Sequence, residues 1–341
     1  MRLKGLDGIR SICAMLILLG HMVNQSFVDW SVFSLPLPEC IAYVFFMISG
    51  ILAGYRIDYV SSAKSYYIKK AKRILPLYYL YILIVLIVFP LIGRGSEVFN
   101  ATLFYYLFLT PSIPFAASNG IIPLVHLWFI GSLVIFYLVI PVFAQLKHGI
   151  RKNSALAIAV LWFAIKIFAK ICGGGFLYYL IGCTSFDILF IGVWGGMAIR
   201  DGLFNTAKTN CLIFSVFAWG MFLSSGFYGH LIPAPIRTEF IALLSLIIIV
   251  TQQRQNSSPL LENKVAHFLG NISYEIYVGH ILVIILLSEF YQRMNYYVAD
   301  WLIYMMATML GILFAIALKM GASFLLASTK SKRSLLACLG K

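Results

Sequence analysis

Long apolar runs dominate the chain and are separated by short polar connectors. Because a hydrocarbon core about 30 Å thick takes around 20 helical residues to cross, these runs predict an all-α integral membrane protein with about ten transmembrane helices in one bundle. The predicted spans are residues 7–26, 38–57, 74–93, 122–144, 154–172, 184–200, 210–228, 236–253, 267–288 and 299–326. A shorter run at 101–116, interrupted by Pro111 and Pro114, is predicted to lie in an outer loop or to be re-entrant.

The composition excludes an ordinary soluble domain. Hydrophobic residues make up 61% of the chain and charged residues 11%, whereas soluble domains carry about 25% charged residues. The sequence contains no internal repeat and no change of composition that would mark a second soluble domain. We therefore predict one transmembrane domain over residues 1–328, followed by a short basic cytoplasmic tail at 329–341.

The net charge of +14 is unevenly distributed over the predicted loops. If the N-terminus is cytoplasmic, most Lys and Arg residues fall on the cytoplasmic side, as the positive-inside rule requires. The exceptions are Arg94, Lys166, Lys170, Arg237 and Arg293. This asymmetry predicts that both termini are cytoplasmic. Membrane topology therefore accounts for most of the positive charge, and no nucleic-acid partner is expected.

The first predicted helix carries an unusual set of ionisable residues. Asp7 and Arg10 are three positions apart and can pair on one helix face. His21 follows Arg10 by eleven positions, which places it on nearly the same face about 16 Å further along the axis. An imidazole at that depth can take a proton from a hydroxyl group that attacks a carbonyl. The alternative is a histidine that packs against a neighbouring hydroxyl in a purely structural role.

Five sequence blocks, in order from residue 6 to residue 280, resemble the membrane-bound acyltransferase-3 family, whose members modify surface polysaccharides, lipopolysaccharide and peptidoglycan. The blocks are LDGIR with the spacing of Arg10 and His21; VFFMISGILAG with Phe45, Phe46, Ser49 and Gly50; the basic segment with Lys70, Arg73, Pro76 and Tyr78; HLWFIGSLVIFYLVIP at 126–141; and ISYEIYVGH at 272–280. Two departures stand out. Leu133 and Val134 occupy positions where many relatives carry Glu, and Lys70 stands where relatives often have a second arginine.

The resemblance implies a membrane O-acyltransferase of the bacterial plasma (inner) membrane. Its donor would be cytoplasmic acyl-CoA, most simply acetyl-CoA, and its acceptor a hydroxyl group of a cell-surface polysaccharide or of a lipid-linked precursor. His21 and Arg10 would be catalytic, and Lys70, Arg73 and Arg10 would bind the donor. An arginine fork and a lysine point charge suit phosphate groups. The alternative for the basic cluster is positive charge that contacts lipid headgroups.

The ninth predicted helix supplies a second polar face. Ser273, Tyr277 and His280 follow i, i+4 and i+7 spacing, so they can line one cavity together with Ser49 and Trp128 and bind the acceptor. Aromatic residues at such spacing are also common in cores and interfacial belts. No metal site is expected, because the six cysteines lack metal-ligand spacing. The resemblance implies no bound cofactor, with acyl-CoA as a substrate.

Three carboxylates in apolar runs, Asp187, Glu239 and Glu275, are expected to be neutral or paired, with Lys166 and Lys170 as possible partners. Other functions remain open at this point: succinyl instead of acetyl transfer, a transporter or flippase of glycan precursors, or a non-catalytic component of a polysaccharide export assembly. The acceptor glycan and the oligomeric state are not determined by the sequence.

Overall fold

The computed structural model describes residues 3, 5–24, 37–202, 234–254, 259–294 and 299–339, and over these ranges all regular elements are helices. The main helices are α1 (Leu6–Asn24), α2 (Leu37–Tyr55), α3 (Ala63–Leu91), α6 (Trp128–Phe143), α7 (His148–Ile171), α8 (Gly175–Thr184), α9 (Phe186–Arg200), α11 (Ala234–Arg254), α12 (Lys264–Asn271), α13 (Ser273–Met294) and α14 (Asp300–Leu339). Shorter elements are η2 (Ile57–Tyr59), η3 (Gly95–Glu97), α4 (Leu103–Leu107), α5 (Ser112–Ala116) and η4 (Ile122–Leu127).

The helical class predicted from the sequence is confirmed. Six stretches of the described chain are long and apolar enough to cross a membrane: Ala63–Leu91, Ile122–Phe143, His148–Ile171, Gly175–Arg200, Ser273–Arg293 and Asp300–Ala327. Two shorter apolar helices, Ile41–Tyr55 and Glu239–Val250, accompany them. The predicted span 210–228 lies outside the described residues, as does the side chain of Arg237. The run at 101–116 forms the short helices α4 and α5, neither of which is long enough to span a bilayer.

Several predicted boundaries are wrong, because an apolar run does not reveal where a helix breaks or how far it continues into polar sequence. Helix α3 begins at Ala63, where Ser62 caps it, so the basic cluster lies inside the helix and not before it. The predicted connector before residue 184 contains α8, which is separated from α9 by Ser185 in a left-handed conformation. The predicted helix 267–288 is divided at Ile272 into α12 and α13.

Helices α2 and α9 pack with their backbones in contact. Gly50 and Gly54 on α2 face Gly192 and Gly196 on α9, and a β-carbon at any of the four would collide with the backbone of the opposite helix. Small residues at i and i+4 on both helices allow this approach, which is a common mode of helix association in membranes. The close contact fixes α2, the helix that carries Ser49, against the rest of the bundle.

Ion pairs sort the helix ends into two groups. At one end, Asp58 before α3 pairs with Arg151 on α7 and with Arg200 at the end of α9. At the other end, Arg94 after α3 pairs with Glu97 and with Glu289 near the end of α13. We call these the Asp58 end and the Arg94 end. This pairing is consistent with the predicted alternation of helix directions.

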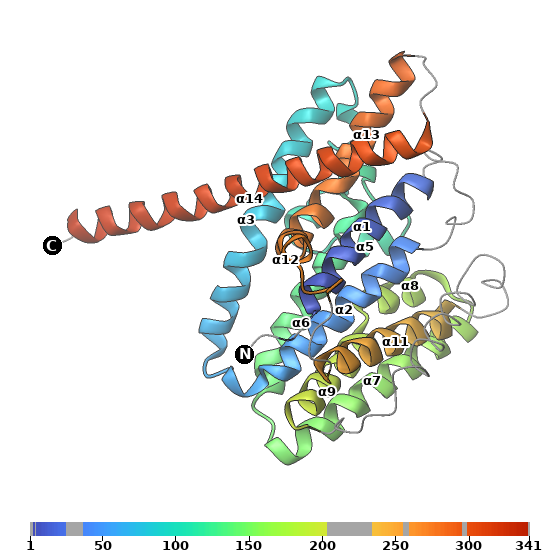
Figure 1. Cartoon of the computed structure of the whole chain (residues 1–341), viewed down its shortest axis with the longest axis vertical. Coiled ribbons are helices and arrows are strands. Elements are labelled where there is room, and N and C mark those ends of the chain that lie inside the picture. Colours follow the sequence, from blue (N-terminus) through green and yellow to red (C-terminus); the bar gives the residue numbers. More distant parts are fainter. Residues whose placement is uncertain are drawn as a thin grey trace.

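Figure 1 shows how these helices are arranged. Helices α7, α9 and α11 form one group, α1 and α2 run through the middle, and α3 lies on the opposite side. Helix α14 crosses the bundle beside α13 and α3 and then projects beyond it toward the C-terminus. The helical conformation of α14 therefore continues to Leu339, into the segment predicted as a tail.

Candidate functional site

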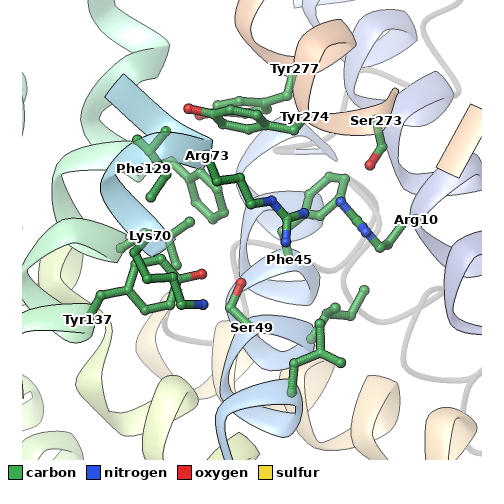
Figure 2. A pocket seen from close by; sticks show the side chains of 14 residues that line it. Arg10, Phe45, Ser49, Lys70, Arg73, Phe129, Tyr137, Ser273, Tyr274 and Tyr277 are labelled. Carbon is green, nitrogen blue, oxygen red and sulfur yellow. The ribbon is translucent and has the colours of Figure 1, made fainter. Parts of the chain in front are cut away.

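A pocket of about 90 Å³ opens between α1, α2, α3, α6 and α13. Figure 2 shows the side chains that line it. Three cations, Arg10, Lys70 and Arg73, face the same space, and no Asp or Glu is among the lining residues. The complete lining consists of Arg10, Phe45, Ile48, Ser49, Leu52, Lys70, Arg73, Ile74, Phe129, Leu133, Tyr137, Ser273, Tyr274 and Tyr277. We call it the basic pocket.

The positive charges of the three cations are balanced in different ways. Arg10 is paired with Asp7 at 3.8 Å, as the sequence predicts. The Lys70 ammonium lies 3.8 Å from the centre of the Tyr137 ring, where a cation–π attraction stabilises it. Arg73 is exposed and makes no ion pair with any described residue. The pocket therefore has a net positive charge that is available to an anionic ligand.

Two of the four basic residues at positions 69–73 of helix α3 line the basic pocket. Lys70 and Arg73 are three positions apart and both line the pocket, as i, i+3 neighbours on one face do. Lys69 and Lys72 are exposed and do not line it. The sequence prediction of Lys70 and Arg73 as the donor-binding pair is consistent with this geometry, and the other two lysines suit the alternative of headgroup contact.

The polar residues predicted to line a cavity are divided between two places. Ser49, Ser273 and Tyr277 line the basic pocket, whereas His280 does not. Trp128 is also away from it, because its ring stacks on Phe115 with 5.1 Å between centroids. Trp128 is thus a packing residue between α6 and α5 in this structure, which does not support the predicted role in acceptor binding.

Sequence reasoning missed Tyr137 as a pocket residue. Its ring on α6 carries the Lys70 ammonium of α3 and lies in the same pocket as Ser49 of α2. Tyr137 belongs to the Tyr-x-x-x-Pro pattern that contributes to the family resemblance, and this pattern was the one available signal. Leu133 of α6 lines the same pocket, and no acid from α6 does.

Aromatic rings form the inner wall of the basic pocket. Phe45, Phe129 and Tyr277 contact one another, with centroid distances of 6.2 Å between the two phenylalanines and 5.0 Å between Phe129 and Tyr277. All three are buried. The far side of Tyr277 contacts His126 and His280, at 5.6 and 5.8 Å between centroids. This aromatic wall separates the basic pocket from a group of histidines.

The histidines come from three separate segments: His21 on α1, His126 at the end of η4 and His280 on α13. The ring of His280 lies 4.9 Å from that of His21 and 5.1 Å from that of His126, between centroids. His126 and His280 are fully buried, and His21 is partly exposed. The sequence placed His21 and His280 near one cavity and named His126 only beside Trp128 as a guess for acceptor binding, because His126 is 105 positions from His21 in the chain.

A second group of buried charges lies elsewhere in the bundle. Lys166 on α7 pairs with Asp187 on α9 and, at 3.0 Å, with Glu239 on α11. Lys166 was therefore correctly named as a possible partner of both acids. Lys170 instead lies 5.0 Å from the Tyr178 ring. Glu275 makes no ion pair with a described residue, although Arg73 and Arg10 are close enough to influence it electrostatically.

The helical bundle encloses a basic pocket beside buried histidines. A membrane protein with this arrangement can hold an anionic substrate near groups that accept protons. The sequence model of the family described as "Acyltransferase domain", acyltransferase-3, matches residues 3–320 of this chain. The chain therefore belongs to the acyltransferase-3 family. It is a multi-pass membrane protein and an acyltransferase.

Two relatives illustrate this membership. The chain is 26% identical over 248 residues to "Putative acetyltransferase ORF330" of Acidianus two-tailed virus, a match that covers 70% of this chain and 71% of the relative. It is 22% identical over 331 residues to "Putative O-acetyltransferase SACOL0978" of Staphylococcus aureus strain COL, covering 85% of this chain and 52% of the relative. The chain thus spans about half the length of the staphylococcal relative. No solved structure matches the chain significantly.

Proposed function

We propose that this protein transfers an acetyl group from acetyl-CoA, bound from the cytoplasm, to a hydroxyl group of a surface glycan or its lipid-linked precursor in a bacterial plasma membrane. The observation that carries the proposal is the basic pocket, in which three cations converge and no carboxylate takes part in the lining. The printed names of the two relatives, "Putative acetyltransferase ORF330" and "Putative O-acetyltransferase SACOL0978", support acetyl as the transferred group.

The donor fits the pocket by its charge. Coenzyme A carries phosphate groups, and an exposed arginine without an ion pair can bind phosphate through two parallel hydrogen bonds. Arg73 has these properties and lines the pocket about one turn further from the Asp58 end of α3 than Lys70. Lys70 and Arg10 add two more positive charges to the same space. The predicted cytoplasmic location of the Asp58 end would open these cations to the compartment that supplies acyl-CoA.

The thioester arm would have to extend from these cations toward His21. Ser273 and Tyr274 line the route, and the Tyr274 hydroxyl is buried without a hydrogen-bond partner among the described residues. Amide groups of the donor arm can satisfy such a hydroxyl. The aromatic wall of Phe45, Phe129 and Tyr277 then stands between the arm and the histidines, so one of these rings would have to rotate before the thioester reaches His21.

The proposed reaction is a direct transfer. His21 accepts the proton of the acceptor hydroxyl as its oxygen attacks the thioester carbonyl. The tetrahedral intermediate then expels the sulfur, and the C–S bond breaks. The imidazolium of His21 returns the proton to the thiolate, so the products are an acetyl ester and free coenzyme A. No proton is gained or lost overall, and no metal is needed to balance the step.

A binding experiment tests the donor site. Isothermal titration of coenzyme A into the purified protein in lipid nanodiscs compares Arg73→Ala with Lys72→Ala. Both variants remove one positive charge from neighbouring positions of α3, but only Arg73 lines the pocket. Because a hydrogen bond to a charged group contributes roughly 1.5–3 kcal/mol, Arg73→Ala should weaken binding about 10- to 100-fold. Equal affinities for the two variants would contradict the donor assignment.

A further inference from the structure

Two buried histidines beside His21 have lone pairs that no described residue uses. His280 Nδ1 is 2.6 Å from the carbonyl oxygen of Tyr277, and His126 Nε2 is 2.9 Å from the carbonyl oxygen of Val278. A carbonyl oxygen only accepts hydrogen bonds, so each of these nitrogens must carry the hydrogen and donate it. In neutral imidazoles the remaining nitrogens, His280 Nε2 and His126 Nδ1, are therefore acceptors.

The positions of these two acceptor nitrogens reduce the stability of the folded protein. Both are buried without a hydrogen-bond partner among the described residues. A buried acceptor that loses water and gains no donor destabilises the folded protein, and native structures retain few such groups without a functional reason. The adjacent carbonyls of α13, on Tyr277 and Val278, hold both rings in the tautomer that leaves the lone pairs unused.

Within the described part of the chain, His21 has no carboxylate partner that could compensate a positive charge. No described Asp or Glu forms an ion pair with His21, His126 or His280. The electrostatic neighbours of His280 are His21 and His126. The two tyrosines in ring contact with His126 donate their hydroxyl hydrogens to backbone carbonyls: Tyr277 to His126 and Tyr81 to Pro123. An imidazolium formed at His21 would thus be poorly solvated unless the neighbouring rings accept its hydrogen.

We propose that His280 stabilises the imidazolium that His21 forms during transfer. This inference rests on the proposed function, in which His21 is the base. When His21 takes the proton of the attacking hydroxyl, its N–H becomes a strong donor, and His280 Nε2 is the acceptor in ring contact with it. His280 is a positioning residue, because it acts through His21 and not on the substrate.

The experiment measures radiolabelled acetyl transfer from acetyl-CoA to endogenous acceptor in inside-out membrane vesicles as a function of pH. His280→Leu keeps an apolar side chain in place but removes the acceptor, while His280→Gln retains one. In His280→Leu, the protonated form of His21 loses its hydrogen-bond acceptor, so the acidic limb of the rate profile should move about one pH unit lower. The maximal rate should fall at least about tenfold. His280→Gln should keep the limb near its wild-type position, and the KM for acetyl-CoA should be unchanged in both variants.

A structural role for His280 predicts another pattern. If Leu and Gln variants show the same limb as the wild type, or shift it equally, the inference is overturned. His280→Phe provides a second variant without an acceptor should His280→Leu fail to accumulate in membranes, and it is compared with His280→Gln in the same way. Wild-type vesicles that transfer no acetyl group at all would instead refute the proposed function, so the two failures are distinguishable.

Discussion

The bundle contains two groups of cations whose environments differ sharply. In the basic pocket, Arg10, Lys70 and Arg73 converge on a space without a lining carboxylate. In the second group, the Lys166 ammonium is 2% exposed and is bonded to two carboxylates, Asp187 and Glu239. A buried charge is tolerated in a folded protein when partners of opposite charge neutralise it. Neighbouring cations without acidic partners repel one another until an anion binds between them.

This difference distinguishes a ligand site from a structural one. The Lys166 group joins α7, α9 and α11, so its partners are built into the fold and nothing further is required to balance the cation. The basic pocket brings like charges from α1 and α3 together, so we expect their repulsion to be relieved when an anion binds. Loss of a cation should therefore reduce stability in the first group and reduce ligand binding in the second.

The largest effect is expected for Lys166→Met. Removal of one partner leaves two buried carboxylates uncompensated, and breaking a buried ion pair costs about 3–5 kcal/mol. The folded fraction, followed by thermal unfolding in nanodiscs, should fall strongly. Lys170→Met is the matched control, because it lies one turn further on α7 and contacts the Tyr178 ring instead of an acid. Similar unfolding temperatures for both variants would show that the Lys166 group is not structural.

The complementary change concerns Arg10→Leu. Removal of a pocket cation relieves repulsion from Lys70 and Arg73, so the unfolding temperature should stay near that of the wild type. The affinity for coenzyme A should fall by about 10- to 100-fold, which corresponds to a lost charge-assisted hydrogen bond. Asp7 loses its partner in this variant, and Asp7→Asn measures that contribution separately. A variant that is unstable yet binds coenzyme A normally would reverse the comparison.

A smaller effect is expected when the whole Lys166 group is replaced. The triple change Lys166→Met, Asp187→Asn and Glu239→Gln removes every formal charge, and replacing a buried ion group is often neutral or stabilising by about 1–4 kcal/mol. The triple variant should thus recover most of the stability lost in Lys166→Met. Stability that remains as low as in the single variant would indicate that packing, and not the uncompensated charge, explains the single result.

The smallest effect is expected at the Arg94 end, outside the membrane-spanning segments. The Arg94 guanidinium holds the pKa of Glu97 below its usual range. This pair therefore stabilises the fold above the pKa that Glu97 has in the unfolded chain, and the contribution is lost as the pH falls through the lowered pKa. Because both side chains are about one third exposed, the contribution is at most about 1 kcal/mol. Thermal unfolding of Glu97→Gln should show a weaker decline at acidic pH than the wild type, and identical curves would contradict this.

Much of the site followed from local spacing. The pairing of Asp7 with Arg10 and the common position of Lys70 and Arg73 depend on i, i+3 neighbours within one helix, which geometry determines directly. The face of Ser273 and Tyr277 on α13 is of the same kind. These parts of the site could be predicted because no contact between distant segments was needed.

The remainder depends on contacts between helices that are far apart in the sequence. His126 joins His21 and His280 only because η4 packs against α13, and the choice of Lys166 over Lys170 depends on how α7 faces α9 and α11. Apolar runs also conceal the breaks at Ser185 and Ile272, because a short kink does not change the mean hydropathy of its surroundings. Such features require the packed bundle.

The central claim is that His21 is the base in acyl transfer from the basic pocket to a glycan hydroxyl. Its most direct test is mass spectrometry of surface glycans from cells that carry the wild type, His21→Gln, or no copy of the protein, at matched protein levels. Glutamine keeps hydrogen-bonding capacity but accepts no proton at neutral pH, and a positioned base contributes about 10² to 10⁴ in rate. The claim predicts base-labile acetyl esters in wild-type glycans and their loss in the His21→Gln cells, as in cells without the protein. Wild-type levels of acetyl ester in His21→Gln cells would contradict it.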